Sequence, residues 1–259
     1  MAKLYLGTSG FKFQDWKGNF YTPQVKEKDW LAYYAERFNA LEVNSSYYRL
    51  LPPATLFHMA NKVPPDFLFT VKAYRTLTHE ISAENAADFA AFKDSLRPLS
   101  DAGKFGCILA QFPSSFHHTP ESRQYLAHLR EQLADYPLAI EFRHREWVQE
   151  EVFAFLRQHR IGWCGVDQPQ FPSLLPPIAP ATSEIGYVRF HGRNYQGWWG
   201  GKARRYDYLY SDEELQEWVP RIQRLEQETE KVFVFLNNCY EAKATQNALR
   251  LRELLELAE

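Results

Sequence analysis

The chain has 259 residues, of which 45% are hydrophobic and 24% are charged, and its formal net charge is −2. This length is close to the roughly 250 residues of a typical (β/α)8 barrel, so we expect one domain over residues 1–259, and the ordinary composition excludes a disordered chain. The small net charge excludes a general attraction to nucleic acid or to anionic membranes, so any such binding needs a local patch.

Cysteine usage and the start of the chain indicate the compartment. Cys107, Cys164 and Cys239 lie far apart without a Cys-x-x-Cys pair, each in or beside an expected strand, so we expect buried, reduced thiols. The chain runs from Met1 into a strand within a few residues, which leaves no room for a signal peptide, and no apolar run approaches a membrane span. We therefore expect a cytoplasmic protein without membrane contact, as a monomer or a weak dimer.

Eight short apolar runs recur along the chain, and nearly all of them end in a polar or charged residue. Their β-branched and aromatic content over about 4–8 residues indicates strands that are buried on both faces. The expected strands are residues 4–7, 41–44, 67–71, 107–110, 138–140, 163–166, 187–190 and 232–236. Polar tips on strands separated by helical segments are typical of the (β/α)8 barrel, which places its active site there. We therefore predict an α/β fold with a single barrel of this type.

Helix signals lie between the expected strands. Residues 30–38 carry an aromatic stripe at helical spacing, and Thr119 is placed to cap the helix that follows it. Residues 211–214 form a capping box, although Pro220 should kink that helix or reset its start. A last helix, residues 242–257, is rich in Ala, Leu, Arg and Glu and closes the barrel.

Two connections depart from the repeat. The segment after Asp167 is so rich in proline through Pro180 that a regular sixth helix is excluded, and we expect an irregular covering segment instead. Residues 193–210 combine glycines, aromatic residues and cations, as a ligand-binding lid does. Trp198 and Arg204 are its expected ligand contacts. The alternative is a rigid loop whose aromatic side chains pack on the outer helices.

The polar strand tips form a candidate site. Residues two apart on a strand share a face, so three strands each present two polar groups in one direction. The pairs are Glu42 with Asn44, Glu141 with Arg143, and Arg189 with His191. Other strands and one loop add the single groups Lys72, His79, Gln111, Asp167 and Asn237. We expect all of them at the barrel mouth, where the alternative to a functional site is a hydrogen-bonded plug.

These residue types suit acid and base chemistry on an anion. We expect Glu141 and His191 as the proton-transfer pair, with Glu42 as a third catalytic residue that orients the cations. The expected substrate-binding residues are Asn44, Lys72, His79, Gln111, Arg143, Asp167, Arg189, Asn237, Trp198 and Arg204. Phosphate or carboxylate is then the feature recognised in a small substrate.

Metal binding is the open alternative at these strand tips. Carboxylates and an imidazole are suitable ligands, but the interleaved lysine and arginine side chains would repel a cation, so we expect no metal and no cofactor. His117 and His118 are adjacent, with no third ligand at metal-site spacing, and are interpreted as part of a solvated loop.

The strand-tip motifs together resemble an uncharacterised bacterial and archaeal family called domain of unknown function 72. Short matching stretches cover essentially the whole chain in order, and they include residues 7–10, 69–72, 78–80, 111–113, 141–144, 189–193 and 237–238. The resemblance implies a TIM-type barrel with a pocket at the strand ends. It implies no particular substrate or reaction.

Three functions are consistent with these patterns. The first is an enzyme, a hydrolase or lyase that uses acid/base catalysis on an anionic substrate at the barrel mouth. The second is a nucleic-acid binding or repair protein in which the loop of residues 193–210 stacks bases and contacts phosphates. The third is a glycoside hydrolase, although cations near both glutamates would depress the pKa that a general acid needs.

Overall fold

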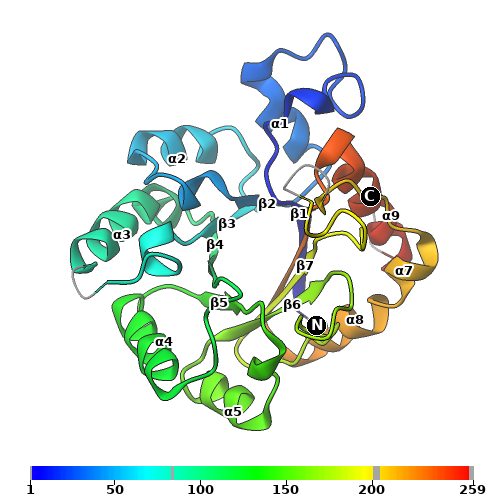
Figure 1. Ribbon diagram of the computed structural model, residues 1–259. Helices are drawn as coiled ribbons and strands as arrows, with labels where there is room; N and C mark the ends of the chain where they lie inside the picture. The colour runs from blue at the N-terminus through cyan, green and yellow to red at the C-terminus, as the bar shows by residue number, and fades with distance from the viewer. Residues whose placement is uncertain (1, 83–84, 201–204, 257–259) are drawn as a thin grey trace.

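The computed structural model describes residues 2–82, 85–200 and 205–256, and within them eight parallel strands close into a barrel (Figure 1). The strands are β1 Lys3–Thr8, β2 Ala40–Val43, β3 Leu68–Lys72, β4 Phe105–Gln111, β5 Leu138–Glu141, β6 Gly162–Asp167, β7 Ile185–Phe190 and β8 Lys231–Leu236. Each strand pairs with its neighbour in sequence, and β8 pairs with β1. The predicted (β/α)8 barrel is confirmed.

Helices form a ring around the strands (Figure 1). They are α1 Trp30–Ala35, α2 Pro53–Ala60, α3 Ala86–Asp101, α4 Pro120–Gln132, α5 Glu150–Gln158, α7 Asp212–Gln216, α8 Val219–Glu228 and α9 Lys243–Leu254. Short 3-10 turns add η1 Gln14–Trp16, η2 Glu27–Asp29, η3 Ser45–Tyr47, η4 Arg75–Leu77, η5 Arg145–Trp147 and η6 Tyr240–Ala242. Residues 168–184, between β6 and β7, contain no helix, as their prolines predicted.

The helix signals act where the sequence places them. The Thr119 side chain accepts a hydrogen bond from the backbone N–H of Ser122 and caps α4. Ser211 and Glu214 form a reciprocal capping box at the start of α7. Pro220 lies in the first turn of α8, so it begins a new helix after α7 rather than kinking one long helix.

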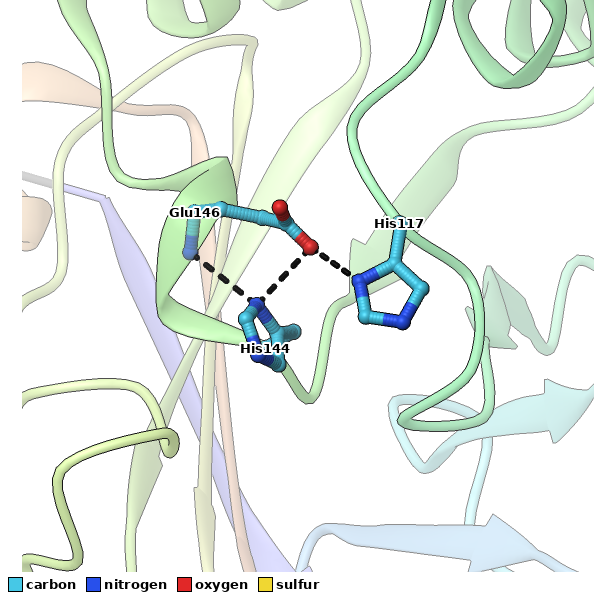
Figure 2. Close-up of side chains that lie close together, drawn as sticks. All are labelled: His117, His144 and Glu146. Carbon is cyan, nitrogen blue, oxygen red and sulfur yellow. Dashed lines mark hydrogen bonds and ion pairs between the residues drawn. The ribbon is translucent and has the colours of Figure 1, made fainter.

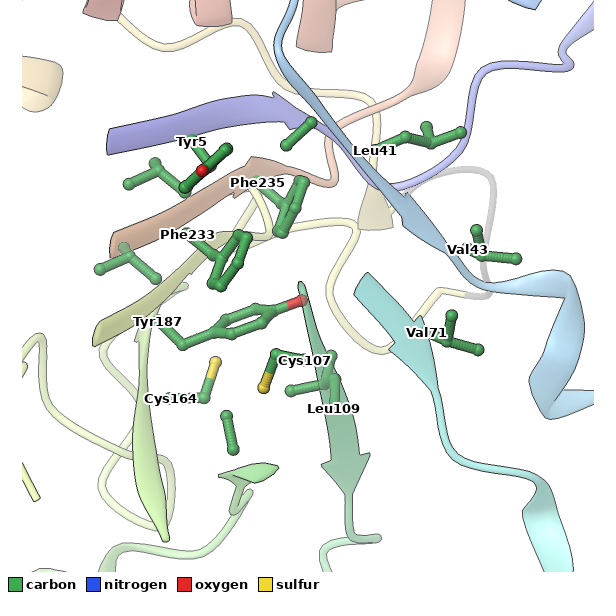
Figure 3. Close-up of a cluster of buried hydrophobic side chains, with 14 of the residues drawn as sticks. Tyr5, Leu41, Val43, Val71, Cys107, Leu109, Cys164, Tyr187, Phe233 and Phe235 are labelled. Carbon is green, nitrogen blue, oxygen red and sulfur yellow. The ribbon is translucent and has the colours of Figure 1, made fainter. Parts of the chain in front are cut away.

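The barrel interior is filled by side chains from alternate strand positions. Tyr187 extends from β7 across the interior toward Cys107 and Leu109 of β4 (Figure 3). Its ring packs on Phe233 and Phe235 of β8, with centroids 6.0 and 5.6 Å apart. Thus this part of the barrel interior is a packed core, not an open channel.

Two further expectations from the sequence concern the state of the cysteines and membrane-spanning helices. Cys107, Cys164 and Cys239 are free and buried, as expected of reduced thiols. Among the residues that the structure describes, no helix is both long enough and apolar enough to cross a membrane.

Gly7 allows β1 and β2 to approach each other. A Cβ at this position would collide with the carbonyl oxygen of Ala40 and lie 2.7 Å from the Tyr34 hydroxyl. That hydroxyl donates to the Ala40 carbonyl oxygen at 3.0 Å and accepts from the Thr8 backbone N–H at 2.8 Å. Glycine is therefore required here by a close backbone approach that also positions the residues following β1.

We expect Gly7→Ala to lower the free energy of unfolding by about 3 kcal/mol, because a backbone carbonyl cannot move aside as a flexible side chain can. Urea denaturation followed by circular dichroism measures this loss. Gly18→Ala is the control, since a Cβ there meets nothing within 4 Å and only its φ of +91° adds strain. Equal losses in the two variants would contradict the steric explanation.

Candidate functional site at the carboxyl end of the barrel

A buried arginine joins two glutamates at the top of the barrel. The side chains of Glu42, Glu141 and Arg189 are 0%, 0% and 2% exposed. Arg189 donates from Nη2 to Glu42 Oε1 at 2.7 Å and from Nη1 to Glu141 Oε2 at 2.5 Å. All three side chains lie on the inner face of the barrel. Arg189 lies two residues beyond the inward-pointing Tyr187 and so shares its face. Glu42 pairs with Thr70, whose hydroxyl lies 2.9 Å from the Tyr187 hydroxyl inside the barrel.

Further side chains complete what we call the Arg189 network. The Tyr187 hydroxyl donates to Glu42 Oε2 at 2.7 Å, and Arg143 Nη2 lies 2.5 Å from Glu141 Oε1. His191 Nε2 is 3.2 Å from Glu141 Oε1, and its Nδ1 is 2.9 Å from Asn237 Nδ2. The network consists of Glu42, Glu141, Arg143, Tyr187, Arg189, His191 and Asn237.

Burial and neighbouring charges shift the pKa values of Glu141 and His191 within the network. Burial alone would raise the pKa of Glu141, but Arg143, Arg189 and His191 keep that pKa well below its usual range. Burial lowers the pKa of His191 to about 3, and Arg143 lowers it further in the same direction. At neutral pH Glu141 is therefore ionised and His191 is neutral, so its Nε2–H donates to Glu141 while Nδ1 accepts from Asn237.

A second set of residues, the Lys72 group, lies beside the network. Lys72 Nζ donates to Gln111 Oε1 at 2.7 Å and lies 4.5 Å from the centre of the Tyr47 ring. The His79 ring meets the same tyrosine edge-on at 4.9 Å. The Lys72 group comprises Tyr47, Lys72, His79 and Gln111. Tyr47, His79 and Lys72 are partly exposed, whereas Gln111 is buried.

Desolvation also changes proton affinity in the Lys72 group. Burial, together with the positive charge of Arg189, lowers the pKa of Lys72 to about 7. Burial and the charge of Lys72 lower the pKa of His79 to about 4. Lys72 therefore lies within electrostatic range of the Arg189 network, and its lowered pKa allows it to exchange a proton near neutral pH.

Asp167 lies apart from the other strand tips. In the β6–β7 register Val166 pairs with Arg189, whereas Asp167 pairs with Phe190 on the opposite face. The buried Asp167 carboxylate accepts from Tyr210 Oη and Trp218 Nε1, both at 2.7 Å, and from the guanidinium of Arg193. Asp167 thus anchors the loop and helix that follow β7, and the sequence prediction that it faces the barrel mouth with the others does not match its position.

Asn44, Trp198 and Arg204 are the remaining residues that the sequence predicted to contact a ligand. Asn44 is partly exposed and donates to the Ser9 carbonyl oxygen at 3.3 Å, beside the network. Trp198 is 2% exposed, and its carbonyl oxygen accepts from Arg205 Nε while the guanidinium lies 4.8 Å from its ring centre. Arg204 lies outside the described residues.

An exposed aromatic patch joins the two long connections. Phe171, from the proline-rich segment, lies 5.4 Å from the Tyr195 ring and 5.7 Å from the Trp199 ring. Tyr195 and Trp199 are 51% and 67% exposed. Composition indicated aromatic residues in the second connection, but their contact with Phe171 depends on the tertiary structure.

The sequence did not identify Tyr187 as a site residue, and it did not reveal the neighbours of His117. Tyr187 was detectable, because it lies two residues before Arg189 and shares its face. His117 lies beside His144 and Glu146, which come from the segment after β5 (Figure 2). Spacing within the His117–His118 pair could not reveal these partners, which belong to another loop.

Fold and site together define a TIM barrel whose carboxyl end carries a buried charge network and a partly exposed lysine. The chain belongs to the family described as protein of unknown function DUF72, whose model matches residues 5–259.

The relatives span nearly the whole chain. The UPF0759 protein YunF of Bacillus subtilis (strain 168) is 33% identical over 273 residues, covering 98% of this chain and 95% of its own. The DUF72 family protein TM1631 of Thermotoga maritima MSB8 is 39% identical, with a TM-score of 0.91 and coverage of 98% and 99%. The DUF72 family protein EF0366 of Enterococcus faecalis V583 is 28% identical, with a TM-score of 0.89 and coverage of 99% and 96%.

We expect Arg189→Met to lower the free energy of unfolding by about 3–5 kcal/mol, because it leaves two buried carboxylates without their shared counter-charge. Arg224→Met is the matched control, since Arg224 pairs with Glu228 at 2.8 Å while its side chain is 74% exposed. The control should lose less than about 1 kcal/mol. Urea unfolding measures both variants, and a loss of similar size in each would contradict a structural role for Arg189.

Proposed function

We propose that this protein is an enzyme of the hydrolase or lyase type that acts on a small substrate bearing a phosphate or carboxylate. The proposal rests on the lowered pKa of Lys72. This partly exposed amine lies beside the charges of the Arg189 network, and its pKa is lowered to about 7. An amine with such a pKa exchanges its proton at neutral pH, as acid/base catalysis requires.

The charge balance favours an anionic ligand. Three cations, Lys72, Arg143 and Arg189, accompany two carboxylates, Glu42 and Glu141. The cluster therefore carries one excess positive charge when Lys72 is protonated and none when it is not. Arg189 is buried and paired with both carboxylates. In contrast, the Arg143 side chain is 13% exposed and Lys72 is partly exposed. Lys72 and Arg143 are the two cations that an incoming anion would meet.

Proton transfer is assigned to Lys72 rather than to Glu141 and His191. Glu141 is held ionised and His191 neutral, and both are fully buried, so neither offers a proton near neutral pH. A bound anion would raise the pKa of Lys72 and keep its ammonium form. In a hydrolysis, that ammonium would donate its proton to the leaving group as water attacks, and solvent would then reprotonate the amine.

The other predicted catalytic residues would act by positioning. Glu42 and Glu141 hold Arg189, and Glu141 holds Arg143 from its other oxygen at 2.5 Å. His191 orients Glu141 in turn, and Asn237 holds His191 through its other ring nitrogen. Fixing Arg143 in this way reduces the entropy lost when it binds an anion.

Binding of inorganic phosphate tests the anion site. We expect tighter binding at about pH 6 than at about pH 8.5, because Lys72 adds to the attraction of Arg143 only while it is protonated and its pKa lies near 7. Lys72→Met should weaken binding at the lower pH by about tenfold to a hundredfold and should remove the preference for the lower pH, since phosphate itself becomes more negative as the pH rises. Isothermal titration calorimetry gives both affinities. The exposed Lys17 provides the control variant Lys17→Met, and phosphate binding equal in wild type and Lys72→Met would refute the site.

Catalysis is tested with bis(p-nitrophenyl) phosphate, an anionic chromogenic probe. If Lys72 is the general acid, kcat/KM should fall as the pH rises through about 7, where the free enzyme loses that proton. Lys72→Met should abolish this fall together with most of the rate. A pH profile that is the same in the variant and in wild type would assign the chemistry to another group.

Nucleic-acid binding is a second candidate, supported by the aromatic patch of Phe171, Tyr195 and Trp199. Exposed rings that lie close together offer stacking surfaces for bases without reading sequence. Two of the three rings are more than half exposed, and the patch belongs to the connections that follow β6 and β7, on the same barrel face as Lys72.

We expect Trp199→Ala to weaken binding of a single-stranded oligonucleotide by about 1–3 kcal/mol, the usual value of one stacked base. Fluorescence anisotropy at several salt concentrations measures the affinity. Phe57→Ala is a suitable control, because Phe57 is 54% exposed on α2. If wild type shows no salt-dependent binding, or if both variants bind as wild type does, the patch has another role.

Glycoside hydrolysis, the third alternative, receives no support. A general acid in that reaction is a carboxyl group with a raised pKa. Glu141 has the opposite shift, and both glutamates are occupied by Arg189.

A further inference from the structure

Two histidines and a glutamate from two different loops converge on the carboxyl face of the barrel. His144 and Glu146 follow β5, and His117 belongs to the β4–α4 connection (Figure 2). One ligand atom from each residue lies within 4.8 Å of the other two. Glu146 Oε1 lies between the imidazoles, 2.9 Å from His144 Nδ1 and in contact with His117 Nδ1. We call these three residues the His117 cluster.

The backbone around the cluster is held rigidly. Trp147 donates from Nε1 to the Phe116 carbonyl oxygen at 2.8 Å, which ties the two loops together next to His117 and Glu146. The Trp147 ring stacks on Phe116 and on Phe142, with centroids 5.4 and 4.1 Å apart and interplanar angles of 6° and 11°. Trp147 itself is fully buried. The cluster is therefore preorganised by a packed aromatic stack beneath it, rather than assembled by chance on mobile loops.

The cluster is separate from the Arg189 network, although His144 directly follows Arg143. Glu141 and Arg143 point into the network, and the intervening Phe142 packs on the Trp147 stack. Alternation therefore directs His144 to the opposite side, toward the β4–α4 connection. The two sets have no residue in common. The lysine and arginine side chains that disfavour a metal at the strand tips are therefore not members of the His117 cluster.

The donor set matches one coordination chemistry in particular. Two imidazole nitrogens and one carboxylate oxygen form a three-ligand set that leaves a fourth tetrahedral position open, as in catalytic zinc sites. Zn–N and Zn–O bonds of about 2.0–2.1 Å place tetrahedral ligand atoms about 3.3 Å apart. Glu146 Oε1 lies closer than this to both imidazole nitrogens, so a metal would require the carboxylate and the rings to move apart. The His117 side chain is 53% exposed and can make this movement.

We propose that His117, His144 and Glu146 bind one divalent transition-metal ion of the zinc class, through Nδ1 of each histidine and a carboxylate oxygen. Imidazole donors select such an ion over magnesium or calcium, which prefer oxygen ligands. The proposal does not depend on the anion site, because none of its ligands belongs to the Lys72 group or to the Arg189 network.

Zinc binding to untagged, chelator-treated full-length protein tests the proposal. We expect one Zn(II) per chain by calorimetry, and bound Co(II) should give the visible absorption of a site with fewer than six ligands. His117→Ala and Glu146→Gln should each weaken zinc binding at least tenfold, whereas His58→Ala, at an exposed histidine on α2, should leave it unchanged. Circular dichroism of each variant checks that it is folded, and His144→Asn replaces either variant that is not.

Several outcomes would overturn the site. Wild type that binds no zinc, or that binds it no better than His117→Ala and Glu146→Gln, leaves the three residues as a hydrogen-bonded surface group. Equal loss in the His58→Ala control would show nonspecific binding to surface histidines. Lys72→Met should bind zinc as wild type does, so failure of the anion site and failure of the metal site are distinguishable.

Discussion

The burial of Arg189 is the constraint on which the rest of the site depends. A guanidinium taken out of water inside the barrel is tolerated only when opposite charges and hydrogen-bond acceptors surround it closely. Glu42 and Glu141 provide the charges, and Ser9 Oγ lies 3.4 Å from Nη2. Each glutamate then needs partners for its second oxygen, which come from Tyr187 on one side and from Arg143 and His191 on the other.

This network explains why the reactive group is found at its edge. Arg143, Arg189 and His191 keep the pKa of Glu141 well below its usual range, so this carboxylate does not exchange protons near neutral pH. Lys72 is desolvated by the same environment and repelled by Arg189, and its contacts with Gln111 and Tyr47 supply no negative charge. Burial at the edge of the network, together with the positive charge of Arg189, therefore brings the pKa of Lys72 toward neutrality.

The connections after the strands divide the carboxyl face into regions of different chemistry. The segments after β2 and β3 contribute Tyr47 and His79 to the Lys72 group. Those after β4 and β5 carry the His117 cluster, and those after β6 and β7 carry the exposed aromatic patch. Asp167, on the outer face of β6, fastens the last of these connections through Arg193 and Tyr210. A rigid barrel can carry such independent regions because the loops of each region follow different strands.

The sequence alone determined the eight strands, the irregular proline-rich unit and the polar strand tips, because apolar runs, proline and residue alternation act locally. It also paired Glu141 with Arg143 correctly. Which face a tip occupies was decided by the tertiary structure, since strands buried on both sides carry no alternation to reveal it. Asp167 is an example: it pairs with Phe190 and faces outward, whereas its neighbour Val166 pairs with the inward-facing Arg189. Contacts between loops, such as His117 with Glu146, and the lowered pKa of Lys72 likewise arise only when distant segments remove water from one another.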